Sequence, residues 1–258
     1  MHYIFFDIDG TLVADVNKQP YLPLSTKQTI KKLQEKGHVV AIASGRPIEM
    51  ILSLAKELAI KDIVSDGGFG LMIQNKIIHI DPLDKEITVR LSQELLDKKI
   101  PFAFMTDSTS RQLIASNKML NNRLNYDFEN IPVVLDENFD PLNEIAYKVF
   151  IGITKSQESN IETVDCSKIM RYDPNCLAYE PDDKYRGVKE LVDYYHGDIK
   201  DVIFFGDGLN DIALAKQIPF TIAMGNAIDE LKEIACFVTK DILDDGIEYA
   251  CKHFNLID

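Results

Sequence analysis

Residues Tyr3–Leu12, YIFFDIDGTL, join an apolar run to a pair of acids. The run of four apolar and aromatic residues is typical of a strand buried on both faces. It ends at Asp7 and Asp9, whose i, i+2 spacing at a strand end projects both carboxylates to one side of the backbone. Gly10 lets the chain turn without a Cβ penalty, and Thr11 adds a hydroxyl and an exposed amide. Paired carboxylates repel unless a cation or a shared proton relieves them, so this stretch is a candidate site, although Asp and Gly are also ordinary turn residues.

Composition limits the classes of partner. The chain has 258 residues, 46% of them hydrophobic, which suits one large α/β domain or two smaller ones. The formal net charge of −13 repels nucleic acid and anionic lipid, so neither is an expected partner, whereas a small anion can bind in a locally positive pocket. No signal-peptide pattern and no membrane-length apolar run is present, which predicts a cytoplasmic protein.

The cysteines give no metal-binding pattern. Cys166, Cys176, Cys236 and Cys251 show no CxxC spacing, and the histidines do not cluster near them. Zinc is therefore not expected. The four cysteines are expected to be free thiols in a reducing compartment.

Strand and helix patterns alternate in the first and last parts of the chain. An irregular excursion is expected over residues 14–24. The predicted strands are 3–6, 38–43, 63–64, 201–205 and 220–224, and the predicted helices are 25–36, one opened by Pro47, 188–195 and one that begins at Leu209 or Asn210. This alternation predicts a parallel sheet covered by helices.

Pro82 marks a change of pattern. A helix over 86–98, strands at 102–105 and 112–115 about a turn at Asp107-Ser108, a helix over 117–126 and a strand at 147–153 indicate an inserted α+β module. Continuation of the parallel sheet is the alternative, which the scarcity of helices between these strands disfavours. The predicted domains are therefore a core made of residues 1–82 and 178–258 and an inserted module made of residues 83–177.

Polar residues follow several of the predicted core strands. Asp7 and Asp9 follow the first, Ser44 the second, and Asp207 and Asp211 the strand at 201–205. In open parallel sheets ligands bind beyond the carboxyl ends of the strands, so these residues are expected to share one site. Carboxylates without His or Cys favour a hard cation, above all Mg²⁺. A nucleophilic Asp needs such a cation, because each repulsion with a phosphate charge costs about 4 kcal/mol at ~4 Å and an effective dielectric of ~20.

Positive groups for an anion are expected at two further places. Ser44 stands where a helix begins, so its hydroxyl, the nearby amides and the positive helix end can bind phosphate. Lys184 lies just before the helix at 188–195 and is the best-placed lysine, with Arg186 and Lys189 as rivals about one helical turn away. Arg46 is predicted to pair with a carboxylate of the core rather than to contact substrate.

Four motifs in this order, DIDGTL, ASGR, the Lys184 segment and GDGLND, resemble those of the haloacid dehalogenase superfamily. The large insertion between ASGR and Lys184 resembles the cap of the Cof-type phosphatases, and MGNA at Met224–Ala227, followed by Lys232 and Val238-Thr239, is similar to that subgroup. The resemblance covers essentially the whole chain, tightly in the core and loosely in the insertion. It implies an α/β fold, in which a Rossmann-like parallel-sheet core carries an inserted α+β cap, and a Mg²⁺-dependent phosphatase.

The resemblance also implies a role for each matching residue. Asp7 resembles the nucleophile that forms an aspartyl-phosphate, and Asp9 the acid that protonates the leaving oxygen and then serves as base for water. Asp7 and Asp207 would hold Mg²⁺, with the main-chain carbonyl of Asp9 and the Asp211 side chain in support. Asp211 has the alternative role of capping its own helix. The residues implied to bind phosphoryl oxygens are Gly10, Thr11, Ser44, Gly45, Lys184 and Asn210.

One residue departs from the family pattern. Asp66, in SDGGFG, stands where the family usually carries asparagine. An acid at this place adds negative charge near the phosphate site unless Arg46 or Lys184 neutralises it.

The expected function is hydrolysis of phosphomonoesters of small metabolites by a monomer or a homodimer, with sugar phosphates, phosphorylated cofactors and nucleotides as open substrate classes. The first alternative is a phosphomutase acting on a hexose phosphate, since phosphomannomutases share the opening motif and a similar cap, although their second motif differs from ASGR. The second is a catalytically silent sensor of a phosphate ligand. The intact Asp7, Asp9, Lys184 and Asp207 argue against a sensor, which needs no nucleophile and no acid.

Overall fold

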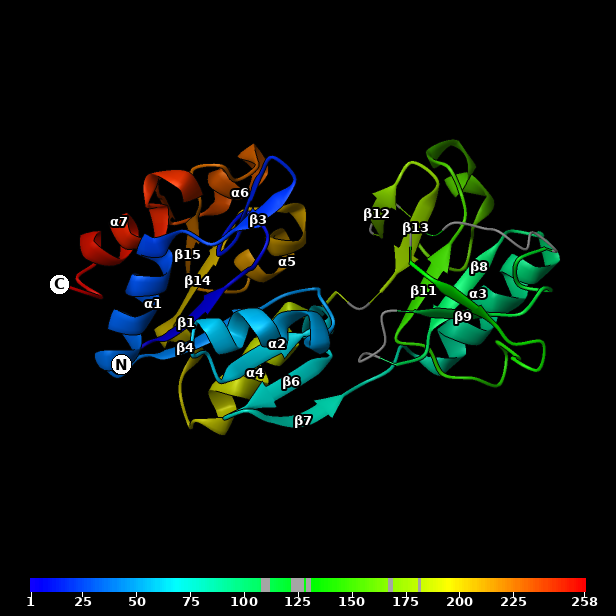
Figure 1. Cartoon of the computed structure of the whole chain (residues 1–258), viewed down its shortest axis with the longest axis horizontal. Coiled ribbons are helices and arrows are strands. Elements are labelled where there is room, and N and C mark those ends of the chain that lie inside the picture. Colours follow the sequence, from blue (N-terminus) through cyan, green and yellow to red (C-terminus); the bar gives the residue numbers. More distant parts are fainter. Residues whose placement is uncertain (108–111, 122–127, 129–130, 167–168, 181) are drawn as a thin grey trace. The chain divides into compact units, whose positions relative to one another are not determined.

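The computed structural model describes residues 1–107, 112–121, 128, 131–166, 169–180 and 182–258 (Figure 1). The chain divides into two compact units. Residues 1–80 and 182–258 form the core unit, and residues 81–181 form the inserted unit. Each unit has its own main sheet. Among the described residues, no helix combines the length and the apolar character that a membrane crossing requires.

The core unit is built on an eight-stranded sheet in the order β16-β15-β14-β1-β4-β5-β6-β7 (Figure 1). All neighbouring strands from β16 to β5 run parallel, which confirms the predicted parallel sheet for this part of the chain. The strands are β1 Tyr3–Phe6, β4 Val39–Ala43, β5 Asp62–Ser65, β6 Gly70–Ile73, β7 Lys76–Ile80, β14 Val202–Gly206, β15 Phe220–Ala223 and β16 Phe237–Val238.

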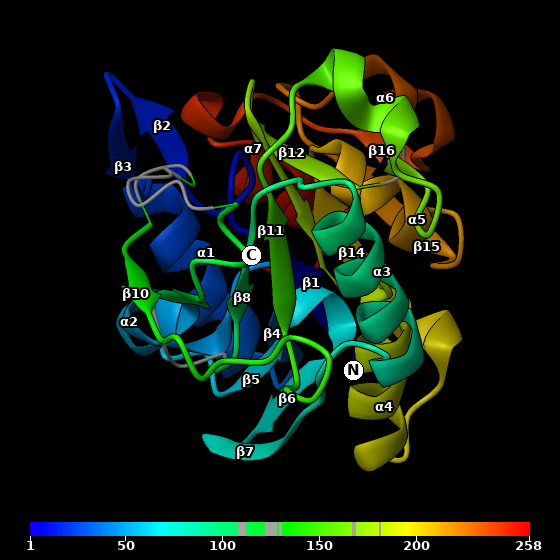
Figure 2. The same ribbon diagram turned by 90° about the vertical axis from the view of Figure 1, so that its right-hand side faces the viewer.

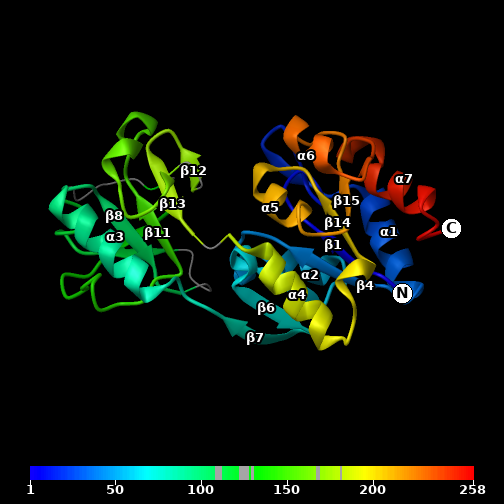
Figure 3. The ribbon, with the colours of Figure 1, turned by 180° about the vertical axis from the view of Figure 1, so that it is seen from behind.

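Helices cover both faces of this sheet, as the apolar sequence of β1 predicts. Ile4 and Phe6 pack into one apolar cluster with α1, α2 and α7, whereas Tyr3 and Phe5 pack into another with α4. Figure 1 shows α1 and α2 on the near side, and Figure 3 shows α4 on the opposite side. The helices of the core unit are α1 Leu24–Glu35, α2 Ile48–Glu57, α4 Lys184–Tyr194, α5 Ile212–Ala215, α6 Asp229–Ile234 and α7 Gly246–His253.

Two hairpins in the core unit differ from the sequence prediction. β2 (Ala14–Val16) and β3 (Gln19–Tyr21) pair antiparallel where an irregular excursion was expected, and β6 and β7 extend the sheet antiparallel beyond β5. Each turn has two successive residues at positive φ, Asn17 and Lys18 at 55° and 61°, and Gln74 and Asn75 at 51° and 63°. Such turns match the twist of the strands but usually carry glycine, so the sequence signal for them is weak.

The inserted unit has a six-stranded sheet in the order β10-β9-β8-β11-β13-β12. Its neighbouring strands are antiparallel except for β9 and β10. Figures 2 and 3 show α3 lying on one face of this sheet. The elements are α3 Lys85–Asp97, β8 Phe102–Met105, β9 Leu113–Ala115, β10 Val133–Leu135, β11 Lys148–Ile151, β12 Met170–Asp173 and β13 Cys176–Tyr179.

The helix predicted over 117–126 is wrong for its described part. Residues 117–121 form turns, in which the Leu120 amide donates to Ser116 and the Asn121 amide to Lys118. Asn121 also has a φ of 52°, which a helix does not accept. Asparagine competes with helical hydrogen bonding through its own side chain, which explains why an apolar periodicity fails to form a helix here. Residues 122–127, and Ser108 of the predicted Asp107-Ser108 turn, lie outside the described residues.

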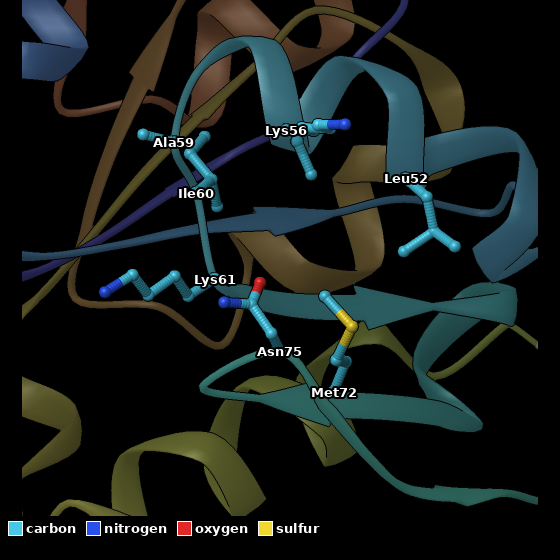
Figure 4. Close-up of a pocket in the computed structure, with 8 residues that line it drawn as sticks. Leu52, Lys56, Ala59, Ile60, Lys61, Met72 and Asn75 are labelled. Atoms are coloured by element: carbon cyan, nitrogen blue, oxygen red, sulfur yellow. The ribbon is translucent and has the colours of Figure 1, made fainter.

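A surface hollow of about 350 Å³ lies between the end of α2 and the β6–β7 turn (Figure 4). Its lining includes Leu52, Lys56, Ile60, Lys61, Met72 and Asn75. Lys61 directly precedes β5, so the hollow lies toward the amino ends of the parallel strands. The polar residues singled out in the sequence follow the carboxyl ends of these strands, and the hollow is therefore a separate feature.

Candidate active site

Three neighbouring strands carry the predicted site residues at their carboxyl ends. β14, β1 and β4 are adjacent in the sheet, and each of the two pairs is parallel and in register. Asp7 follows β1, Ser44 follows β4 and Asp207 follows β14. The Asp7 amide continues the pairing by donating to the Phe205 carbonyl at 3.0 Å. The sheet topology therefore gathers residues about 200 positions apart at one edge, as expected for a parallel sheet.

Gly10 lets the first loop approach Asp207. Its φ is +79°, and a Cβ built on it would lie 2.0 Å from an Asp207 carboxylate oxygen. The Thr11 hydroxyl donates to Asp207 Oδ1 at 2.8 Å, and the side-chain Nδ2 of Asn226 donates to the Gly10 carbonyl at 2.8 Å. The glycine is thus required by space as well as by backbone conformation.

Lys184 is the lysine that reaches the site. Its Nζ donates to Asp7 Oδ1 at 2.8 Å and to Asp211 Oδ1 at 2.6 Å. The two rivals point elsewhere, since Arg186 pairs with Glu190 and Lys189 with Asp193. Lys184 is the first residue of α4 rather than a residue before the helix, and its side chain is only 2% exposed.

Glycines at the end of β5 place Lys184. The Asp183 amide donates to the Gly67 carbonyl at 2.7 Å. A Cβ on Gly68 would lie 1.9 Å from the Asp183 carbonyl oxygen, and a Cβ on Gly187 would lie 2.4 Å from the Val64 side chain. The start of α4 therefore packs directly on the backbone that follows β5. No local sequence pattern marks this role of Gly67 and Gly68, because their partner, Asp183, lies more than a hundred residues away.

Replacement of Gly68 by alanine should disturb the site through this contact. The Cβ meets backbone atoms at a φ of +98°, so we expect a loss of at least about 2 kcal/mol in the free energy of unfolding, together with reduced turnover. Gly37→Ala is the matched control, since Gly37 has a φ of +79° but no neighbouring atom within 4 Å of its Cβ. Urea unfolding and phosphate release would measure both effects. Equal effects of the two substitutions would contradict the packing role of Gly68.

Asp7, Asp207 and Asp211 form an acidic cluster. Each offers a carboxylate oxygen that lies within 4.8 Å of the other two. Burial raises the pKa of Asp7 to about 7, against the pull of Lys184, and burial raises the pKa of Asp207 to about 6. Burial alone would lower the pKa of Lys184, but the Asp211 and Asp7 carboxylates outweigh it and raise that pKa. One ammonium thus faces three carboxylates, and this excess of hard oxygen donors fits a divalent cation such as Mg²⁺.

Asp211 is engaged by the protein on both oxygens. Oδ1 accepts from Lys184, whereas Oδ2 accepts from the amides of Asp207 and Gly208 at 2.9 and 3.1 Å. It therefore closes the turn Leu209–Asp211, of which it is the last residue, whereas its side chain makes no capping hydrogen bond to α5, the helix that follows. Its side chain is fully buried.

Asp9 is not one of the three clustered carboxylates, although its charge helps to raise the pKa of Asp207. Its side chain is 63% exposed and accepts hydrogen bonds from Arg46, from Nε at 2.8 Å and also from a terminal nitrogen. Arg46 thus pairs with a carboxylate of the core unit, as predicted. Its partner is Asp9, the residue expected to protonate the leaving oxygen. The two-point geometry is the strong form of an arginine–carboxylate contact.

The remaining predicted phosphate-binding residues lie on neighbouring loops. Ser44 is buried, and its hydroxyl accepts from the Arg46 amide at 3.2 Å, with Gly45 between them. Asn210 belongs to the Gly206–Asp211 loop, where its Oδ1 lies 2.6 Å from the Cβ position of Gly208. These residues share the strand-end edge with the cluster.

Asp66 takes a structural place in the turn after β5. It is buried, has a φ of 49°, and its Oδ2 accepts from the Ser65 hydroxyl at 2.8 Å. Its amide donates to the Arg46 carbonyl at 3.0 Å. Asparagine and aspartate are the residues other than glycine that most readily adopt positive φ, so either one suits this turn.

The fold and the site define a class, an α/β protein with an acidic site beyond the carboxyl ends of a parallel sheet. The chain belongs to the haloacid dehalogenase-like hydrolase family, whose model matches residues 4–250. It is an enzyme, a hydrolase of the phosphatase type. The resemblance found in the sequence motifs is thereby confirmed.

Individual relatives agree with this assignment over 96% or more of their length. YkrA of Bacillus subtilis (strain 168), which is named provisionally as a phosphatase, is 33% identical over 256 residues, 98% of each chain. The 5-amino-6-(5-phospho-D-ribitylamino)uracil phosphatase YwtE of the same organism is 26% identical, with 96% of each chain covered. A solved sugar phosphatase of haloacid dehalogenase subclass IIB is 27% identical and superposes with a TM-score of 0.77 over 100% of both chains. These likenesses confirm the predicted α/β fold.

Proposed function

We propose that this protein is a Mg²⁺-dependent phosphatase that hydrolyses phosphomonoesters of small metabolites through an aspartyl-phosphate. The observation that carries the proposal is the position of Asp7, a buried carboxylate 2.8 Å from Lys184 and beside two more carboxylates. A site built only to bind phosphate would gain nothing from a carboxylate aimed at it, because like charges repel. A carboxylate nucleophile, in contrast, has a use at this position, and Lys184 together with a divalent cation held by the other carboxylates would neutralise the charge that it must approach.

In the proposed reaction Asp7 attacks phosphorus, and the bond from phosphorus to the leaving oxygen breaks. Asp9 donates its proton to that oxygen. Water then attacks the aspartyl-phosphate while Asp9 takes the water proton, which releases phosphate and restores Asp7. Because the Asp9 carboxylate pairs with Arg46 in this structure, we propose that Asp9 leaves Arg46 and takes up a proton when substrate binds.

The acidic cluster supports the proposed metal. Asp7 and Asp207 would hold Mg²⁺, with the main-chain carbonyl of Asp9 and Asp211 in support, the latter through its hold on the Asp207 loop. Bound there, Mg²⁺ would supply charge neutralisation between Asp7 and the phosphate dianion, where each bare repulsion costs about 4 kcal/mol. Lys184 supplies a second positive group from the chain itself.

The substrate is proposed to be a small phosphorylated metabolite. Its phosphoryl oxygens would meet Lys184 and the loop groups at the strand ends, namely Gly10, Thr11, Ser44, Gly45 and Asn210. Two relatives are named as phosphatases of a sugar and of a phosphoribitylamino uracil, which supports this class of substrate.

None of the four cysteines, all of which the structure describes, forms a disulfide, which supports a reducing compartment.

Release of inorganic phosphate from p-nitrophenyl phosphate and a panel of metabolite phosphates would test the proposal. We expect turnover in Mg²⁺, its loss in EDTA, and recovery when Mg²⁺ is restored. Asp207→Asn should lose turnover at all Mg²⁺ concentrations or require far more Mg²⁺, whereas Asp15→Asn, at an exposed strand position, should not. The proposal would be overturned if folded protein released no phosphate from any substrate. It would also be overturned if turnover were the same with and without EDTA. Isomerisation of a hexose phosphate in the presence of a bisphosphate would instead favour the mutase.

A further inference from the structure

Leu209 is an apolar side chain left in water beside the acidic cluster. It is 69% exposed, more than any other large apolar residue of the described chain except Met1. It stands midway between Asp207 and Asp211, so its Cα lies within roughly 7 Å of each of theirs, the longest reach of two chain steps. Singly exposed apolar residues are common on protein surfaces, but Leu209 stands between two acids, Asp207 and Asp211, that both belong to the acidic cluster.

The loop around Leu209 is held without its side chain. The Asp211 carboxylate accepts from the amides of Asp207 and Gly208, and Thr11 fixes the Asp207 carboxylate. Asp211 is itself bound by Lys184. These hydrogen bonds use backbone and polar side-chain groups alone, so the conformation of the loop does not depend on a leucine at its tip.

An apolar side chain in this position has one evident use during the proposed reaction. The phosphoryl group would enter the cluster and the rest of the ester would stay outside it, where an exposed side chain on the Asp207–Asp211 loop can touch it. Apolar surface of the ester that covers Leu209 is removed from water together with it, which strengthens binding roughly in proportion to the area covered. A strongly hydrated, many-hydroxyl group gains little from this contact.

We propose that Leu209 is a specificity-determining residue that contacts the leaving group and favours phosphomonoesters with an apolar ring over hexose phosphates. This inference rests on the proposed phosphatase function. It selects, among the open substrate classes, phosphorylated cofactors and nucleotides, whose flat rings present apolar faces.

The test compares kcat/KM of wild type and Leu209→Ala for p-nitrophenyl phosphate and for glucose 6-phosphate, in Mg²⁺. We expect the variant to lose roughly tenfold on the aryl ester and less than about twofold on the hexose phosphate, the scale of one apolar pocket contact. Inhibition by inorganic phosphate, which has no leaving group, should stay unchanged. Leu209→Met, which keeps an apolar side chain of similar reach, should retain most of the preference.

Tyr194→Ala is the control for a general effect of removing exposed apolar surface. Tyr194 is 55% exposed and ends α4, ten residues and therefore about 15 Å along the helix from Lys184. It should leave both substrates unaffected. The inference about Leu209, but not the proposed function, would be overturned by any of three results for Leu209→Ala. These are an equal loss of kcat/KM on both substrates, weaker inhibition by inorganic phosphate, and no change in kcat/KM on either substrate. Absence of turnover by the wild type would overturn the proposed function, and this inference with it.

Discussion

Asp7→Asn should abolish turnover while leaving a folded and more stable protein. Asparagine keeps the shape of the side chain and a hydrogen-bond acceptor for Lys184, but its amide does not attack phosphorus. We expect phosphate release to fall by roughly 10⁴-fold or more, the scale of losing a covalent nucleophile. Rapid quenching should trap a phosphorylated protein in the wild type and none in the variant.

The same substitution should raise stability in metal-free protein at neutral and higher pH. The pKa of Asp7 rises from 3.8 to about 7 on folding, so its ionisation costs more in the folded chain than in the unfolded chain. The wild type therefore loses stability as pH rises from about 4 through about 7. Asparagine does not ionise, and we expect a gain of up to about 4 kcal/mol above pH 7 that vanishes below about pH 4. Urea unfolding in EDTA across this pH range would measure it.

These two readouts separate chemistry from misfolding. Asp15→Asn removes an acid of the same type from an exposed position in the first hairpin, so it should change neither turnover nor the pH dependence. Asp7→Asn that kept more than about one-hundredth of wild-type turnover would rule out Asp7 as the nucleophile. A variant that lost activity and also unfolded at lower urea would show that Asp7 mainly holds the structure together.

Lys148→Met should strongly destabilise the inserted unit. Lys148 is the first residue of β11, its side chain is only 2% exposed, and it forms an ion pair with Glu180, which is 13% exposed. Methionine fills the volume but leaves the Glu180 carboxylate buried without this ammonium. Breaking a buried pair in this way costs about 3–5 kcal/mol. Urea unfolding should show the loss, and hydrogen exchange should rise in β8, β11 and β13 before it rises in β1 and β14.

A double variant tests the physical reason for this loss. Lys148→Met with Glu180→Gln removes both charges, so most of the lost stability should return, because a neutral pair carries no charge-burial penalty. Lys189→Met is the matched control, since its pair with Asp193 is more than half exposed and should contribute less than about 1 kcal/mol. If Lys148→Met were no worse than Lys189→Met, the buried ion pair would have no structural role.

Much of the core fold and of the candidate site followed from local sequence. Apolar runs of four or five residues predict buried strands, and acids, serine and glycine directly after them predict strand ends. Asp7, Ser44 and Asp207 could therefore be assigned to one edge of the sheet from the amino-acid sequence alone. The helix predicted over 117–126 failed in its described part, residues 117–121, because apolar spacing alone does not reveal that asparagine favours turns.

Two features of the core unit could not be predicted because their causes are distant in sequence or weakly marked in it. The hairpin turns at Asn17-Lys18 and Gln74-Asn75 lack the glycine that usually marks them. The position of α4 depends on Gly67, Gly68 and Gly187, which allow the helix start to pack on the backbone after β5. No local pattern encodes that contact.

The sequence by itself determined which residue types stand at which strand ends, since burial and turn preferences act over a few neighbouring residues. Only the tertiary structure decided that Lys184, and not Arg186 or Lys189, faces Asp7. It also decided that Arg46 binds Asp9. Both choices depend on how elements far apart in the chain pack together, and a rotation of α4 by one residue would have pointed a different side chain at the acidic cluster.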